Sequence, residues 1–78
     1  MSPTIYKTKN LRIVIYPHDH APAHVHLIGP DAEAKFELAS LECISSFGFS
    51  MKALSKIRTF LKARQHNLIE TWNEWQEE

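Results

Sequence analysis

The stretch HVHLIGPDAEAKFEL, residues 24–38, decides the fold. Its centre, Gly29-Pro30-Asp31, has the turn chemistry of a hairpin. On the second arm, apolar and charged residues alternate, which is typical of a strand with one buried face. The residues expected to face inward there are Ala34, Phe36 and Leu38. The stretch therefore predicts two antiparallel strands, residues 24–28 and 32–38, joined by a tight turn.

The segments on either side of this hairpin extend the predicted sheet. Residues 11–16, LRIVIY, are β-branched and aromatic, which favours a strand. Pro17 ends that strand because it has no backbone N–H for a neighbouring strand. Residues 41–47 form a weaker candidate for a fourth strand, since two serines interrupt the apolar pattern and a glycine follows it.

Residues 50–78 change to the period of a helix. Ser50 is a good N-cap, and neither glycine nor proline occurs after it. Helical spacing puts six large apolar residues on one stripe: Leu54, Ile57, Leu61, Leu68, Trp72 and Trp75. Gln65 interrupts this stripe. A bend near residue 66 is therefore as compatible with the sequence as a straight helix of about 40 Å, at ~1.5 Å per residue.

Together these elements predict a single α+β domain over residues 1–78. An antiparallel sheet of three to four strands would be covered on one face by the long C-terminal helix, either straight or bent near residue 66. The strands at 11–16 and 24–28 carry apolar side chains on both faces, and one helix covers only one. We therefore expect another protein chain, either a second copy or a different partner, on the second face.

Composition narrows the class of protein. Nine basic and nine acidic residues balance in the 78-residue chain, so no general electrostatic attraction to nucleic acid is expected. The single cysteine, Cys43, cannot form an internal disulfide. The sequence has no basic-then-apolar leader and no apolar run near the ~20 residues of a membrane span. These features favour a soluble, cytoplasmic protein with no membrane partner.

Four of the five histidines lie within residues 18–26, HDHAPAHVH. Residues i and i+2 of a strand share a side, so His24 and His26 would present adjacent imidazoles, which His20 could approach across Pro22. Imidazoles near a cation suit acid–base chemistry, as in a small metal-independent ribonuclease. Lys35 or Arg12, on neighbouring strands, could hold the phosphate. The candidate catalytic residues are His20, His24, His26 and Lys35.

Two other uses of the same residues stay open. Two strand histidines and a third ligand would form an open zinc or nickel site, with Asp19 or His18 as a fourth group. Alternatively, the imidazoles and Tyr16 contact a partner protein without any catalysis. A histidine at a strand end is also often only a solvated polar residue. The favoured interpretation needs no cofactor, with zinc or nickel as the alternative.

Four segments of the chain resemble a known family of small prokaryotic proteins, domain-of-unknown-function family 4160. They are His20 through His26, Glu33-Ala34-Lys35-Phe36, Gly48-Phe49-Ser50 and Leu68-Ile69-x-x-Trp72. The resemblance runs from about residue 9 to residue 75, and its specific part is the histidine motif, which maps onto His20, His24 and His26. The chain departs from it in two places. Many members have proline where Ala23 stands, and many have a helix histidine where Arg64 stands, with His66 displaced.

This resemblance implies a toxin-like component of a type II toxin–antitoxin module, because members are commonly encoded beside a second small protein. A small antitoxin protein would then be the partner, and RNA the expected target of a ribonuclease-like histidine cluster. A homodimer and a heterodimer with the antitoxin would each cover the apolar second face of the sheet. The alternatives are a non-catalytic protein-binding or regulatory module, or a metal site on the same histidines.

Overall fold

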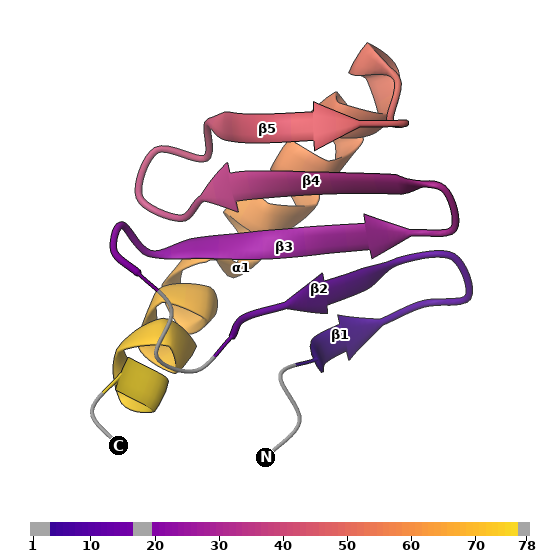
Figure 1. The fold of residues 1–78 in the computed structure, drawn as a ribbon. Coiled ribbons are helices and arrows are strands. Elements are labelled where there is room, and N and C mark those ends of the chain that lie inside the picture. The colour runs from indigo at the N-terminus through magenta and orange to yellow at the C-terminus, as the bar shows by residue number, and fades with distance from the viewer. Residues whose placement is uncertain (1–3, 17–19, 77–78) are drawn as a thin grey trace.

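The computed structural model describes residues 4–16 and 20–76, which form one sheet and one helix. The elements, in chain order, are β1 (Thr4–Lys7), β2 (Arg12–Val14), β3 (His24–Gly29), β4 (Ala32–Glu37), β5 (Cys43–Phe47) and α1 (Met51–Gln76). All neighbouring strands are antiparallel and lie in the order of the chain. The helix crosses one face of this meander (Figure 1). The predicted α+β fold is confirmed, and the sheet has one strand more than the upper number expected.

The additional strand is β1. Its four residues, Thr-Ile-Tyr-Lys, are too few to show a strand period by themselves. Contacts with the helix hold it: the Tyr6 ring centroid lies 4.9 Å from that of Phe60, and the Arg64 guanidinium carbon lies 5.7 Å from the Tyr6 centroid. The strand therefore depends on residues more than fifty positions away. Local sequence could not reveal it.

The core lies between α1 and the facing side of the sheet. The sheet contributes Ile13, Ile15, Val25, Leu27, Ala34, Phe36 and Leu38, and the helix contributes Ile57, Leu61, Leu68, Trp72 and Trp75. The alternation predicted for β4 and the predicted helix stripe are both confirmed. Burial of each large apolar side chain contributes about 1.5–3 kcal/mol, so this layer supplies most of the favourable free energy of folding.

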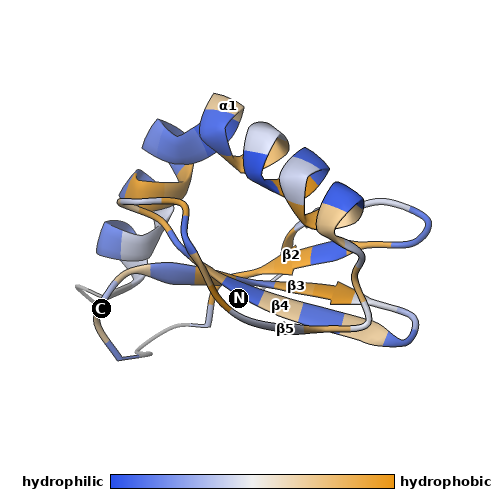
Figure 2. Cartoon of the chain, turned by 90° about the horizontal axis from the view of Figure 1, so that it is seen from above, coloured by the Kyte–Doolittle hydropathy of each residue, from blue (hydrophilic) through white to orange (hydrophobic). Residues whose placement is uncertain are grey.

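The helix is continuous from Met51 to Gln76, and its axis changes direction about midway over the sheet (Figure 2). It begins where expected, because the Ser50 hydroxyl accepts a hydrogen bond from the Ala53 N–H at 3.0 Å. Gln65 interrupts the apolar stripe for a structural reason. Its side-chain amide donates to the carbonyls of Leu38 and Ala39, at 2.6 and 3.1 Å, and so anchors the helix to the turn between β4 and β5.

The other side of the sheet, which we call the open face, carries the alternate residues of each strand. Pairing aligns Val14, His26, Lys35 and Ser45 in one row across β2 to β5. Val14 is only 2% exposed although it lies outside the core cluster, so at least one apolar side chain is buried on the open face as well. Within the described residues, no helix combines the length and hydropathy that crossing a bilayer requires.

The backbone at Gly48 passes close to Asp31 and Ala32, which gives a first prediction. Its φ is +82°, and a Cβ there would collide with the Asp31 carbonyl oxygen and lie 2.8 Å from the Ala32 Cα. Gly48→Ala should therefore lower the free energy of unfolding by about 2 kcal/mol or more, measured by urea denaturation. Gly29→Ala is the matched control. Its Cβ would meet its nearest atom, the Asn10 oxygen, at 3.4 Å, and a comparable loss in both variants would contradict this explanation.

Candidate functional site

The histidine site is built on β3, which begins at His24. The alternation of side chains along β3 places His24 and His26 on the side of the open face, and their ring centroids lie 5.1 Å apart. The predicted pair of adjacent imidazoles is therefore confirmed. Strand pairing puts Lys35 directly opposite His26 on β4, and Val14 opposite it on β2.

Four aromatic rings, which we call the histidine stack, form a continuous series at this end of the sheet. They are Tyr16, His26, His24 and Trp72, and consecutive centroids are 4.9, 5.1 and 5.1 Å apart. Interplanar angles of 73°, 68° and 51° are tilted or edge-on, the arrangements that aromatic pairs prefer over a face-to-face sandwich. The stack joins the end of β2, the start of β3 and the C-terminal half of α1, which pass close together in Figure 1.

His24 is the one buried polar side chain among the described residues, at 6% exposed. Its Nδ1 lies 2.7 Å from the carbonyl oxygen of Pro22, which follows a cis Ala21–Pro22 bond. A carbonyl can only accept, so Nδ1 carries the proton and donates it. In the neutral ring, Nε2 then has the lone pair. This hydrogen bond and the contact with Trp72 fix the ring, and they close the loop that leads into β3.

His26 and Lys35 are more open. Both are half-buried, and the Cβ atoms of residues directly opposite in an antiparallel pair are about 4.5–5.5 Å apart. The Nε2 atom of His26 is shielded from solvent, so any group that reaches this ring from the open face meets another part of it. An imidazole-bearing and an ammonium-bearing residue are thus cross-strand neighbours on a partly accessible surface. An imidazole can take or give a proton, and an ammonium group can hold an anion.

The third histidine of the predicted set has different surroundings. His20 is exposed in the loop before β3 and is not one of the four rings of the stack. His18 and Asp19, the further metal ligands of the zinc or nickel alternative, lie outside the described residues. In the part of the chain that is described, no group of three or more His, Cys, Asp or Glu side chains is arranged to hold a metal ion.

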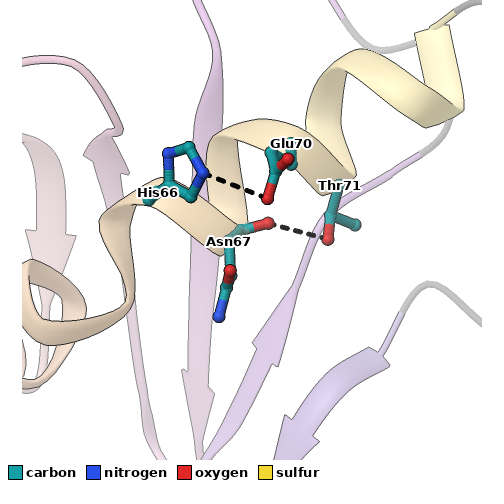
Figure 3. A network of polar contacts seen from close by, with 4 residues as sticks. All are labelled: His66, Asn67, Glu70 and Thr71. Atoms are coloured by element: carbon teal, nitrogen blue, oxygen red, sulfur yellow. Dashed lines mark hydrogen bonds and ion pairs between the residues drawn. The ribbon is translucent and has the colours of Figure 1, made fainter.

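The helix contributes an aromatic ring to this site, and its histidine lies elsewhere. His66 is 86% exposed, and its Nε2 lies 3.3 Å from the Glu70 carboxylate one turn further on (Figure 3). Beside this pair, the Thr71 hydroxyl donates to the Asn67 carbonyl (Figure 3). Arg64, which stands where many members of the family have a histidine, packs over the Phe60 ring.

The fold and the site together define a class of protein. It is a small α+β protein with a five-stranded meander, one covering helix and a histidine stack where the central strand begins. One family model, described as "Domain of unknown function (DUF4160)", matches residues 10–73. The match covers most of the chain, so the chain belongs to this family. Comparisons with curated proteins and with solved structures each found no significant match.

The surroundings of His24 give a second prediction. His24→Ala should lower the free energy of unfolding by about 2–4 kcal/mol, because it removes a buried ring and its hydrogen bond. His24→Phe keeps most of the packing with Trp72 but loses the bond to Pro22, so about 1–2 kcal/mol is expected. Thermal and urea unfolding measure both. If His24→Ala were as stable as the parent protein, the role of His24 in closing the loop would be wrong.

Proposed function

We propose that this protein is a toxin-like component of a type II toxin–antitoxin module, with a ribonuclease-like activity in the cytoplasm. The observation that carries the proposal is the pairing of His26 with Lys35 on the open face, beside a ring stack that fixes the orientation of His26. The family resemblance supports the same reading. The chain's neutral formal charge is compatible with it, since only a local basic surface is needed.

The chemistry assigns each residue a distinct part. His26 takes the proton of a ribose 2′-hydroxyl, whose oxygen attacks the adjacent phosphorus. Lys35 stabilises the negative charge on the phosphate oxygens. The bond from phosphorus to the 5′ oxygen breaks, and that oxygen takes a proton from an acid, for which the exposed His20 is the candidate. The products are a 2′,3′-cyclic phosphate and a 5′-hydroxyl. His24 positions His26 and does not touch the substrate.

The sequence predicts the antitoxin on the second face of the sheet. Because that face carries the His26–Lys35 pair, the proposed antitoxin site is instead the β5 edge, where apolar side chains remain exposed. Ile44, Phe47 and Met51 are 50%, 65% and 82% exposed along the β5 edge and at the start of α1. Residues 43–47 contain no charge and no proline, the features that usually protect an edge strand from pairing. By contrast, the other edge strand, β1, carries Lys7 and a register shift.

The same edge favours a second candidate function, a non-catalytic binding module. In that case the histidine stack only shapes the domain, and the protein acts by docking a partner. The two candidates differ in which residues matter. Catalysis depends on His26 and Lys35, whereas a binding module depends on Phe47 and its neighbours on the β5 edge.

Growth after controlled induction is the measurement that separates them. Expression of the parent protein should arrest growth, and His26→Gln and Lys35→Gln should each relieve the arrest. In vitro, each variant should cleave RNA at least about 100-fold more slowly, the usual contribution of one acid–base group. Lys52→Gln, which removes one exposed charge from α1, is the matched control and should behave as the parent protein.

The soluble yield of every variant is checked first, and circular dichroism then shows whether the variant is folded. His24 is left unchanged in this experiment, because its loss would be expected to unfold part of the site. If both open-face variants still arrest growth, the catalytic proposal is wrong. Loss of arrest only in Phe47→Ser would instead favour the binding module.

A further inference from the structure

A second feature of the open face lies at the opposite end of the sheet from the stack. The β1–β2 hairpin and the turn between β3 and β4 meet there and border a shallow, open depression of about 350 Å³, which we call the hairpin pocket. Both turns lie at the same end of the sheet in Figure 1. The pocket is lined on one side by Lys7, Lys9 and Arg12, and on the other by Ile28, Gly29 and Pro30.

Three cationic residues line this pocket, and none of the described residues that line it carries a carboxylate. Lys7 and Arg12 are directly opposite each other on β1 and β2, and Lys9 lies in the turn between them. In the described part of the chain, no ion pair joins any of the three to an acidic side chain. The Thr8 N–H donates to the Leu11 carbonyl at 2.8 Å, so the turn that presents Lys9 is closed by its own hydrogen bond.

This arrangement is unfavourable without an anion. Like charges directly opposite in an antiparallel pair repel each other and destabilise it. Since the whole chain has a formal charge of zero, the cluster is a local concentration of charge and does not reflect a general excess of lysine and arginine. An anion in the pocket would turn the repulsion into attraction. Phosphate is an anion that several N–H donors of lysine and arginine can surround.

We propose that the hairpin pocket binds a backbone phosphate of single-stranded RNA, a site that rests on the proposed function. The row Arg12–Ile28 lies two residues along β3 from the row Val14–His26, about 6.6 Å away on the same face. An RNA strand held in the pocket therefore continues toward His26 and Lys35. Tyr16, 41% exposed beyond His26, offers a ring on which a base can stack.

The charges on β4 define the path of the strand. Glu33 lies opposite Ile28, and Glu37 lies opposite His24, so carboxylates flank Lys35 on both sides along β4. An RNA backbone is repelled from this strand except at Lys35. It is attracted toward the β1–β2 hairpin, where Lys7, Lys9 and Arg12 lie. The open face is thus divided into a basic side that binds RNA and an acidic side that limits its position.

Binding of a short, fluorescein-labelled single-stranded RNA tests the proposal, with every 2′-hydroxyl methylated so that cleavage cannot interfere. The variant Lys7→Gln/Lys9→Gln/Arg12→Gln should bind at least about tenfold more weakly at low salt. The slope of log K against log salt should fall by about 0.7, the value for one phosphate contact in single strands. The matched control is Lys52→Gln/Lys56→Gln/Lys62→Gln, which removes the same charge from exposed positions of α1 and should bind as the parent protein.

Equal weakening in both triple variants, or parent-like binding by the pocket variant, would overturn the proposal. Saturable binding of inorganic phosphate without any binding of RNA would also overturn it, in favour of a small phosphorylated ligand. Folding provides an independent check. The pocket variant should melt at or above the temperature of the parent protein, because repulsion is relieved, and a lower melting temperature would contradict the premise.

The same measurements separate this proposal from the proposed function. If the methylated RNA binds through the pocket but unmodified RNA is never cleaved, the RNA-binding pocket is supported and the ribonuclease-like activity is contradicted. If RNA is cleaved while the pocket variant binds and cleaves as the parent protein does, the ribonuclease-like activity is supported and the RNA-binding pocket is contradicted.

Discussion

The pairing of β3 with β2 and β4 is the constraint on which the rest of the structure depends. Its register puts Val25 and Leu27 under the helix, and it places His24, His26 and Ile28 on the open face. A slip of one residue would reverse these two sets, burying imidazoles in the core and exposing the apolar side chains. The hydrogen bond from His24 to Pro22 fixes where β3 begins, so it helps to prevent that slip. The core, the histidine stack and the hairpin pocket all follow from one choice of register.

The two strand histidines illustrate how one motif can serve two purposes. They are two residues apart and share a side, yet His24 is enclosed by Pro22 and Trp72 whereas His26 remains partly open beside Lys35. The buried ring limits the positions that the open ring can adopt. A catalytic group held by packed neighbours is more precisely placed than one on a free loop. The segment therefore places a buried, fixed imidazole next to a more accessible one.

Much of the fold could be predicted because local sequence patterns determine it. Alternation predicted the inward set Ala34, Phe36 and Leu38, and the N-cap at Ser50 fixed the start of the helix. Sequence reasoning did not reveal β1, which is stabilised by the distant Phe60 and Arg64, or the purpose of Gln65, whose acceptors lie in the turn after β4.

For the candidate site, too, the sequence predicted the local features and did not reveal the contacts between distant segments. The i, i+2 rule predicted that His24 and His26 are adjacent, and this is confirmed. The contact of His24 with Trp72 joins two ends of the chain and needed the tertiary structure. Trp72 lies on the predicted apolar stripe and is buried, but nothing in its spacing connects it with the histidine motif. The catalytic roles predicted for His20, His24, His26 and Lys35 stay predictions.

Mapping by nuclear magnetic resonance tests the central claim most directly, that RNA meets this protein on the open face. Backbone amide signals and histidine ring signals would be followed while methylated single-stranded RNA is added. The account predicts that signals of the β1–β2 hairpin, His26 and Lys35 shift together with one saturation curve, while those of exposed α1 positions such as Lys52 stay constant. Shifts confined to α1 or to the β5 edge, or none at all, would contradict it.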